Sequence, residues 1–284
     1  MRYISSELQG FAAYGNAKEI VKLYKESGFT AYDASMFTGG VFDEILYADN
    51  WQEKAREFRA YADGLGIVCN QTHAPFATAR KGNEEYNAQM LPKIHRAIEV
   101  SGILGAKICV VHPCNDYTAE ENAVLYKNFE ATARKAGVKI AVENMWNWAK
   151  GSSTATPAAC SHHDDFKKHL DLLPNDVFVA CVDIGHAEMA GLDTSAAQMI
   201  KALGKRVECI HLHDVDGVHD NHQVPFTQSV KFADVIDALK EVDYQGDITL
   251  EVAYAPQKTP KALLVPLAKY LAEIANYFKN ELDK

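Results

Sequence analysis

Three carboxylate residues and one histidine recur in the second half of the chain, each at the C-terminal end of a short apolar run. They are Glu143, Asp183, His211 and Glu251, and the gaps between them are 40, 28 and 40 residues. One strand–helix unit of an eight-fold barrel takes about 30 residues, so the four fall on successive strands with room for loop insertions. At the common mouth of such a barrel, these groups would repel one another unless a cation neutralised them. The spacing therefore predicts a divalent metal site.

The donor types indicate which metal is expected. Hard carboxylate oxygens with one imidazole suit Mn²⁺, Mg²⁺ or Co²⁺, and Zn²⁺ is an alternative. Mn²⁺ is our first expectation, with one ion per chain. A single glutamate at a strand end is commonly an ion-pair partner, but four such residues in register are much less expected by chance.

More histidines occupy strand ends or the loops that follow. His73, His112 and His186 are expected at the same mouth as hydrogen-bond partners for a polyol or carbonyl oxygen. His213 is two residues after His211, so both side chains would face the same side of an extended strand. Two further residues, Asp220 and His222, lie in the next loop. Of the other histidines, His95 and His169 are read as structural residues on helices, and His162 and His163 as loop-surface residues.

Short β-branched runs alternate with longer amphipathic stretches, which is the signature of repeated βα units. Four helical stretches end at a glycine just before a strand, at Gly28, Gly66, Gly105 and Gly137. The pattern predicts one (β/α)8 TIM barrel domain over residues 1–284, with an open α/β fold as the fallback. Strands are expected at 2–5, 29–35, 67–73, 106–112, 139–144, 177–183, 207–213 and 247–252, and a closing helix at 260–280.

Two long loops, 74–85 and 145–165, follow strands on the side where barrel enzymes keep their active sites. The second loop carries Trp146 and Trp148. These aromatic rings are expected either to stack on a sugar and seal the site or to pack the loop against the barrel.

Composition excludes several classes of partner. The formal net charge is -9, and the lysines and arginines are scattered rather than gathered into a stripe. An acidic surface repels phosphate backbones, so neither nucleic acid nor an anionic membrane is expected as a partner. The six cysteines include no CxxC pair, a reduced intracellular pattern that, with no signal peptide or membrane span recognised, favours a cytoplasmic location.

Several short motifs together resemble the xylose isomerase-like barrel family. That family contains sugar isomerases, keto-sugar 3-epimerases, inosose dehydratases, hydroxypyruvate isomerases and an abasic-site endonuclease branch. The resemblance covers about residues 1–275, and its strongest motifs are Glu143-Asn144, Asp183-x-x-His186 and Glu251 at the end of the last strand. The other motifs are Thr-His73-Ala-Pro, Val-His112-Pro and His211-Leu-His213-Asp214.

The resemblance implies roles for these positions. Glu143, Asp183, His211 and Glu251 match the family's metal ligands, and Glu143 with Glu251 matches the acid/base pair of the epimerases. His186 matches a position that contacts substrate, and His73, His112, Asn144 and Trp146 are expected beside it. His213, Asp220 and His222 are candidates for a further metal or for substrate. The implied reaction is proton transfer next to a carbonyl, with the metal stabilising the enediolate.

The resemblance leaves the reaction and the substrate open. Residues 212–218 lack the arginine that keto-sugar 3-epimerases carry after the metal histidine, and Val218 stands where hydroxypyruvate isomerases have an arginine. A sugar isomerase or epimerase acting on a small sugar or polyol is our expectation, and an inosose-type dehydratase is the first alternative. The histidine-rich set also resembles the multi-zinc ligand set of the endonuclease branch. A binding protein without catalysis would not need a complete ligand set, and oligomer state is open.

Overall fold

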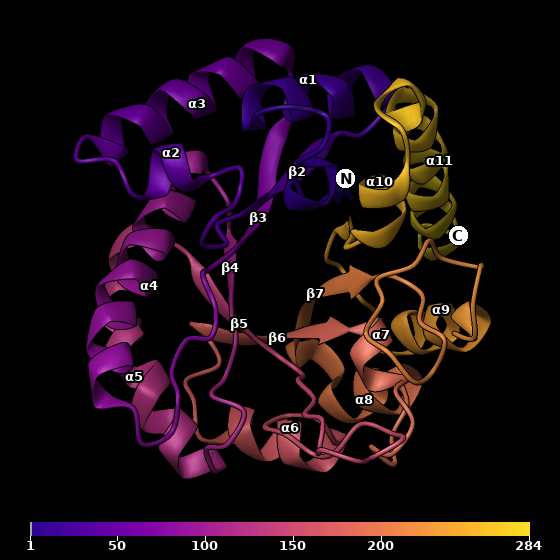
Figure 1. The fold of residues 1–284 in the computed structure, drawn as a ribbon. Helices are drawn as coiled ribbons and strands as arrows, with labels where there is room; N and C mark the ends of the chain where they lie inside the picture. Colours follow the sequence, from indigo (N-terminus) through magenta and orange to yellow (C-terminus); the bar gives the residue numbers. More distant parts are fainter. Residues whose placement is uncertain (1) are drawn as a thin grey trace.

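Eight parallel strands form the inner wall of a barrel in the computed structural model, which describes residues 2–284 (Figure 1). Each strand is hydrogen-bonded to the next one along the chain from β2 to β8, and β8 pairs with β1. The strands are β1 (Ile4–Ser6), β2 (Ala31–Ser35), β3 (Val68–His73), β4 (Ile108–Val111), β5 (Lys139–Glu143), β6 (Phe178–Asp183), β7 (Val207–Leu212) and β8 (Ile248–Leu250).

The seam between β1 and β2 is closed by a few contacts. The amide of Leu8 donates to the carbonyl of Asp33 over 3.1 Å, and the amide of Thr30 donates to the carbonyl of Ile4 over 3.1 Å. A parallel bridge pairs Glu7 with Asp33. These contacts complete the predicted eight-stranded ring, so the open-sheet fallback is not needed.

The helices form a ring outside the strands (Figure 1). The longer ones are α1 (Ala17–Ser27), α3 (Trp51–Leu65), α4 (Glu84–Leu104), α5 (Ala119–Ala136), α6 (His163–Asp171), α8 (Ala196–Leu203), α9 (Phe232–Glu241) and α11 (Leu264–Leu282). Three short helices, α2 (Asp43–Leu46), α7 (Ile184–Ala187) and α10 (Tyr254–Lys258), lie within the connections that follow β2, β6 and β8.

The ends of the helices follow the local sequence. Asn16 and Thr118 cap α1 and α5 with capping boxes, in which side chain and backbone exchange hydrogen bonds. The four predicted glycine stops all have positive φ, at 107° for Gly28, 69° for Gly66, 87° for Gly105 and 69° for Gly137. A side chain is strained in this conformation, so glycine ends each helix at low cost.

Small apolar side chains fill the barrel below its mouth. Val110, Ala141, Val179, Cys181 and Cys209 form one buried cluster from four neighbouring strands. The polar strand-end residues lie above this plug, so the plug is the floor on which the candidate site rests. All six cysteines are buried free thiols.

The structure moves some predicted boundaries. Glu251 and His112 lie just beyond their strands, because β8 ends at Leu250 and β4 at Val111. The last helix begins at Leu264 rather than 260, since a 3-10 turn over Lys261–Leu263 precedes it. His163, predicted in a loop, is the first residue of α6, and the ring of His162 caps that helix by accepting from the amide of Asp164 over 3.2 Å. Within residues 2–284, no helix has the length and apolar character that a membrane crossing needs.

One buried hydrogen bond holds the end of β4 in place, and a substitution that deletes a single oxygen atom removes it. The hydroxyl of Tyr126 on α5 donates to the carbonyl of Val111 over 2.7 Å. We expect Tyr126→Phe to lower the free energy of unfolding by about 1–2 kcal/mol, because that carbonyl loses its donor. Urea unfolding would measure the change, with Tyr270→Phe as control because Tyr270 is 54% exposed. Equal stabilities of the two variants would contradict the expectation.

Candidate metal and active site

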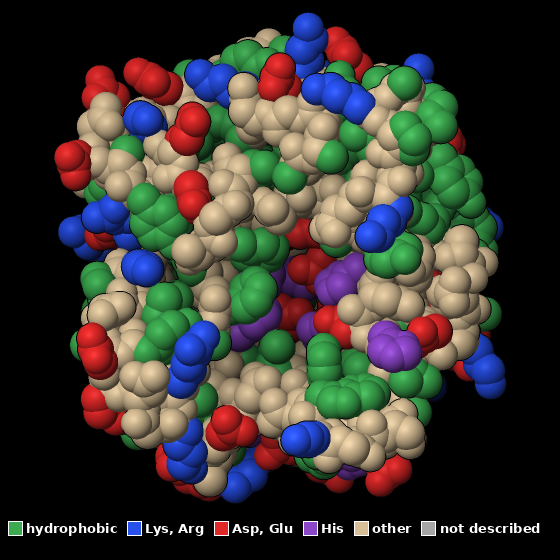
Figure 2. Space-filling view, viewed as in Figure 1, with side chains coloured by type: hydrophobic (Ala, Val, Ile, Leu, Met, Phe, Trp, Pro, Cys, Tyr) green, Lys and Arg blue, Asp and Glu red, His purple; other side chains and the backbone are tan. Residues whose placement is uncertain are grey.

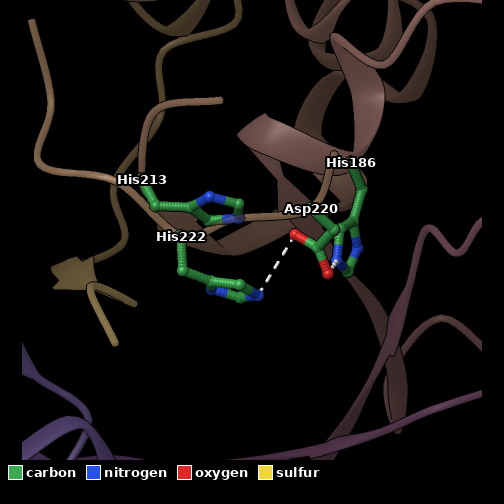
Figure 3. A group of neighbouring side chains, drawn as sticks. All are labelled: His186, His213, Asp220 and His222. Atoms are coloured by element: carbon green, nitrogen blue, oxygen red, sulfur yellow. Dashed lines mark hydrogen bonds and ion pairs between the residues drawn. The ribbon is translucent and has the colours of Figure 1, made fainter. Parts of the chain in front are cut away.

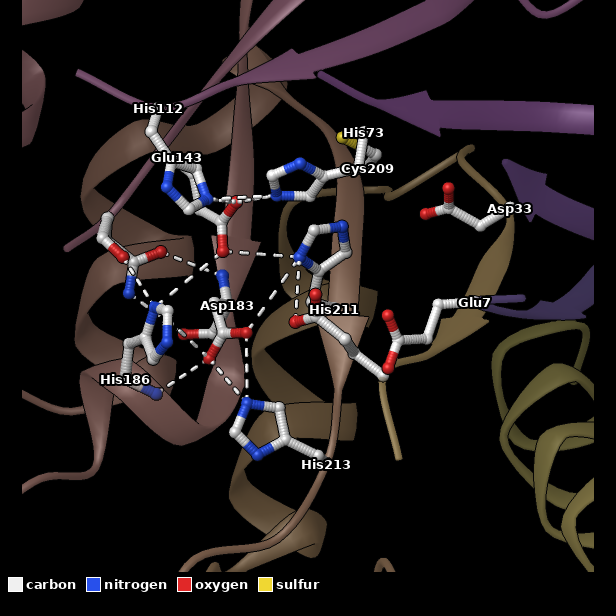
Figure 4. A network of polar contacts seen from close by, with 12 residues as sticks. Glu7, Asp33, His73, His112, Glu143, Asp183, His186, Cys209, His211 and His213 are labelled. Carbon is white, nitrogen blue, oxygen red and sulfur yellow. Dashed lines mark hydrogen bonds and ion pairs between the residues drawn. The ribbon is translucent and has the colours of Figure 1, made fainter. Parts of the chain in front are cut away.

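The four strand-end residues predicted from spacing meet around one imidazole nitrogen, and Figure 4 shows three of them, Glu143, Asp183 and His211. His211 Nδ1 lies 3.3 Å from Glu143 Oε1, 3.2 Å from Glu251 Oε2 and 3.9 Å from Asp183 Oδ2. All four side chains are buried, and the strands β5, β6, β7 and β8 bring them together. The structure therefore places the predicted quartet within one small volume.

Within this quartet, three carboxylates face a single imidazole, so their negative charge exceeds the positive charge that the quartet itself can supply. Glu143 Oε2 and Glu251 Oε2 are buried and accept no well-directed hydrogen bond within residues 2–284, although His112 Nε2 lies 3.1 Å from the first and His211 Nδ1 3.2 Å from the second. Burial alone would raise the pKa of Glu143, but the neighbouring His211 and His112 hold that pKa well below its usual range. Burial would likewise lower the pKa of His211, yet Glu251 and Glu143 raise it well above its usual value. The carboxylates thus stabilise positive charge, and a divalent cation fits this donor set.

A second group of donors shares Glu143 with the quartet. His112 Nε2 lies 3.1 Å and His73 Nε2 3.4 Å from Glu143 Oε2. The two Nε2 atoms are themselves only 2.9 Å apart. Two bare imidazole nitrogens at this distance repel, so a proton or a cation between them is needed for stability.

A third group lies across the mouth and comes from α7 and the loop after β7 (Figure 3). His186 Nε2 lies 3.2 Å from Asp220 Oδ2, and His222 Nε2 lies 3.1 Å from Asp220 Oδ1. His213, which the sequence placed on the same side as His211, lies 3.0 Å from Asp183 Oδ1 through its Nε2. Burial would lower the pKa of His186, but Asp183 and Asp220 raise it to about 10. This group too can hold a cation.

Asn144 has a clear structural partner. Its side-chain amide donates to the carbonyl of Asp183 over 2.9 Å, and its Oδ1 accepts from the amide of Asp183 over 2.8 Å. Asn144 thereby fixes the end of β6 against β5. Its expected contact with substrate stays a prediction.

A cavity of about 540 Å³ opens above the quartet, and Figure 2 shows acidic and histidine side chains at the bottom of a hollow on this face. None of its lining residues within 2–284 is a lysine or arginine. The lining consists of Glu7, Gln9, Phe37, His73, Phe76, His112, Asn115, Glu143, Met145, Trp146, Asn147, Trp148, His186, Asp220, His222, Glu251, Ala253 and Gln257. Two other hollows, of about 590 and 630 Å³, are lined by other residues and hold none of these acids or histidines.

The two tryptophans of the long loop differ in their surroundings: Trp146 packs the loop against the barrel, whereas Trp148 is partly exposed. Trp146 packs against Ala155, Met189 and Leu192, and its Nε1 donates to Asp220 Oδ2 over 3.3 Å. Trp148 is 42% exposed and stacks on His219, with ring centroids 6.1 Å apart. Both line the cavity, so packing of the loop and shaping of the cavity occur together.

Three residues near the quartet were not predicted from the sequence: Glu7, Asp33 and Gln71. Glu7 follows β1 as Glu251 follows β8, so the strand-end rule applied to the first strand would have found it. Asp33 and Gln71 lie within strands, and only the three-dimensional contact of Gln71 with both Asp33 and His211 reveals them.

The family model described as xylose isomerase-like TIM barrel matches residues 21–280 of the chain. Among curated proteins, the uncharacterized protein MJ1311 of Methanocaldococcus jannaschii is 29% identical over 195 residues, 63% of this chain and 62% of that protein. The uncharacterized protein ML2432 of Mycobacterium leprae is 26% identical over 59% of this chain and 64% of its own length. The chain thus aligns with less than two thirds of each of these relatives.

Solved structures share the fold over nearly the whole chain. A D-tagatose 3-epimerase-like protein has a TM-score of 0.76 at 20% identity, covering 99% of this chain and 98% of its own. The IOLI protein, with a binding zinc atom, has a TM-score of 0.76 at 17% identity over the same shares. The 3-keto-D-glucoside 4-epimerase YcjR from E. coli has a TM-score of 0.71 at 15% identity, covering 96% of this chain and 100% of its own. At these identities the likeness establishes the fold.

The close approach of α7 to His213 can be tested with one added carbon. A Cβ on Gly185 would lie 2.1 Å from Cε1 of the His213 ring. We expect Gly185→Ala to displace that ring and to lower the free energy of unfolding by about 1–3 kcal/mol. Gly64→Ala is the matched control, because a Cβ there meets nothing within 4 Å. Thermal unfolding of both variants would check the expectation, which fails if Gly185→Ala is as stable as the control.

The Glu7 carboxyl predicts a pH dependence of stability. Burial and the nearby Glu251 raise the pKa of Glu7 from 4.5 to about 8. Between these values the folded chain holds a proton that the unfolded chain has lost. The free energy of unfolding should therefore fall as pH rises through this window, by at most about 1.4 kcal/mol per pH unit.

We expect Glu7→Gln, which stays uncharged, to lose less stability than the unaltered protein between pH 5 and pH 8. Urea unfolding of metal-free protein at both pH values measures the difference. The exposed Glu273→Gln variant serves as control. An unchanged pH slope in Glu7→Gln would show that Glu7 is ionised in the folded protein.

Proposed function

The chain belongs to the xylose isomerase-like TIM barrel family, and we propose from that premise that it is a divalent-metal-dependent isomerase or epimerase of a ketose or keto-polyol. The observation that carries the proposal is the close approach of two carboxylates to one imidazole nitrogen beside the cavity. Glu143 Oε1 and Glu251 Oε2 lie 3.3 Å and 3.2 Å from His211 Nδ1, and both residues line the cavity.

In this proposal Glu143, Asp183, His211 and Glu251 would hold the metal. Mn²⁺ is the first expectation, with Mg²⁺, Co²⁺ and Zn²⁺ as alternatives, because these ions accept mixed oxygen and imidazole donors. When bound, such an ion supplies Lewis-acid polarisation of a carbonyl and its neighbouring hydroxyl. The buried Oε2 atoms of Glu143 and Glu251, which accept no well-directed hydrogen bond within residues 2–284, support this fit.

The two glutamates would move the proton. One carboxylate takes a proton from the carbon next to the carbonyl, and a carboxylic acid on the other side returns one. Return to the opposite face of the same carbon is epimerisation, whereas return to the neighbouring carbon is isomerisation. His73, His112, His186 and Trp146 line the same cavity and would orient the hydroxyls of the substrate. A dehydratase would begin in the same way and then expel a hydroxyl, so it is the alternative within this chemistry.

The charges of the cavity support an unphosphorylated substrate. Proteins recognise phosphate with arginine, lysine or the N-terminus of a helix. Within the described chain, no lysine or arginine lines the cavity, whereas Glu7 and Asp220 add further carboxyl groups to it. A phosphate ester would therefore meet unfavourable charge on most sides.

A second candidate function rests on the other donor groups. The His73–His112–Glu143 and His186–Asp220–His222 groups flank the quartet and could hold additional ions. Several ions around one cavity suit phosphodiester hydrolysis, as in an abasic-site endonuclease. Against this function stand the net charge of -9 and the lack of cationic side chains in the cavity lining of residues 2–284.

The proposal predicts metal-dependent exchange of a substrate proton. We expect the purified protein to take up a divalent ion and to incorporate deuterium from heavy water into an unphosphorylated ketose or inosose. Glu143→Gln and Glu251→Gln should each reduce the incorporation at least about 10²-fold, because each removes a proton-transfer group. Metal analysis and mass spectrometry of the recovered sugars are the measurements.

Glu273→Gln on α11 is the matched control, and its incorporation should equal that of the unaltered protein. Incorporation that persists in both active-site variants would refute their role. A protein that binds no metal would refute the proposal itself. Two or three zinc ions per chain, no incorporation and nicking of an abasic duplex would establish the second candidate instead.

A further inference from the structure

Three histidines at the mouth have their proton position set by a short hydrogen bond to a backbone carbonyl, and His213 makes a longer contact of 3.4 Å with the carbonyl of Asp214. The Nδ1 of His73 lies 2.9 Å from the carbonyl oxygen of Ala74. The Nδ1 of His186 lies 2.9 Å from that of Asn144, and the Nδ1 of His222 lies 2.9 Å from that of Glu251. A carbonyl oxygen can only accept a hydrogen bond, so each Nδ1 carries a proton. Each Nε2 then faces the neighbouring carboxylate or histidine of its group.

His211 is turned the other way, and among residues 2–284 no backbone carbonyl is its partner. Its Nδ1 faces the carboxylates of the quartet, and its Nε2 lies 3.0 Å from Nε2 of Gln71. For a neutral imidazole to bind a cation through Nδ1, Nε2 must carry the proton and donate it to an acceptor. The side chain of Gln71 is therefore in the place that the carbonyls occupy for the other three histidines.

The orientation of the Gln71 amide decides which proton position His211 adopts. Its NH2 group lies 2.8 Å from Asp33 Oδ2 and 3.0 Å from His211 Nε2, so it donates to both. That arrangement leaves the proton of a neutral His211 on Nδ1, where it blocks the metal. A half-turn of the amide brings Oε1 into the same place, where it accepts from the Nε2 proton of His211.

After that half-turn, Asp33 must donate to the same oxygen, and its surroundings allow this. Asp33 is 2% exposed, and its Oδ1 has no hydrogen-bond partner within residues 2–284. A buried carboxylate with an unsatisfied oxygen costs more free energy than a neutral carboxylic acid in the same place. Burial also raises the pKa of Asp33.

We propose that Gln71 is a positioning residue that selects the metal-binding tautomer of His211 by presenting its carbonyl oxygen to Nε2, with Asp33 anchoring the amide from the other side. This inference rests on the proposed metal site. Gln71 is 2% exposed and does not line the cavity, so it acts on the metal only through His211.

Two substitutions separate the hydrogen-bonding roles of Gln71. Gln71→Met keeps a side chain of similar length but cannot accept a strong hydrogen bond. Gln71→Glu supplies acceptor oxygens and no amide NH2. The test is the amount of Co²⁺ bound per chain across a series of buffered free Co²⁺ concentrations, which resolves one equivalent even if other donor groups also bind ions.

We expect Gln71→Met to weaken the binding of one equivalent about 10- to 100-fold. Gln71→Glu should bind within about three-fold of the unaltered protein, because the position needs an acceptor. Gln198→Met on α8 makes the same chemical change outside the cavity and should not alter binding. Thermal unfolding reports whether each variant is folded. If Gln71→Met does not fold, the Co²⁺ binding of Gln71→Glu is the test of the inference.

Two results would overturn the inference while leaving the proposed metal site standing. One is unaltered Co²⁺ binding by folded Gln71→Met, and the other is a loss in Gln71→Glu as large as in Gln71→Met, which would mean that the position must donate. Failure of the unaltered protein to bind Co²⁺ would overturn the inference and the proposed metal site together.

Discussion

Mutual repulsion between buried carboxylates is the constraint on which the upper half of the barrel depends. Glu143, Asp183 and Glu251 are at most 7% exposed, and the fold brings all three to one imidazole. Burying this much negative charge is stable only if positive charge enters with it. The surrounding histidines provide places for protons or metal ions, and their number at the mouth follows from this need.

The barrel meets this constraint with hydrogen bonds that hold the potential metal-binding side chains, or the strand ends that carry them, in place. Asn144 ties the end of β6 to β5, Tyr126 ties the end of β4 to α5, and backbone carbonyls hold three of the histidine rings. These supports use the chain's own hydrogen-bonding groups, so they order the donors through contacts within the protein. Preorganised donors lower the free energy that binding must otherwise spend on ordering them.

The sequence predicted those features that repeat with the barrel unit. Strand-end acids such as Asp183 and Glu251 recur at the period of one βα unit, and Gly28 and Gly137 end helices for a local conformational reason. Glu7 obeys the same strand-end rule but was missed because the first strand was predicted to end at residue 5, whereas β1 runs to the polar residue Ser6. Gln71 and Asp33 could not be found in this way. Their role depends on contacts between strands far apart in the sequence, and nothing local distinguishes a glutamine that faces a histidine from one that faces water.

The apolar plug below the mouth also bears on which ions can enter. Cys181, beneath Glu143 and His211, offers a sulfur within 4.8 Å of the donor atoms of both. A thiolate there would attract soft ions such as Cd²⁺ in preference to Mn²⁺ or Mg²⁺. Burial, however, raises the pKa of the Cys181 thiol well above its usual value. A soft ion would first have to displace that proton, at about 1.4 kcal/mol for each unit by which the pKa is raised. The burial of Cys181 in the plug thus favours hard ions, because it keeps the thiol protonated. Cys181 has this effect without contacting the metal.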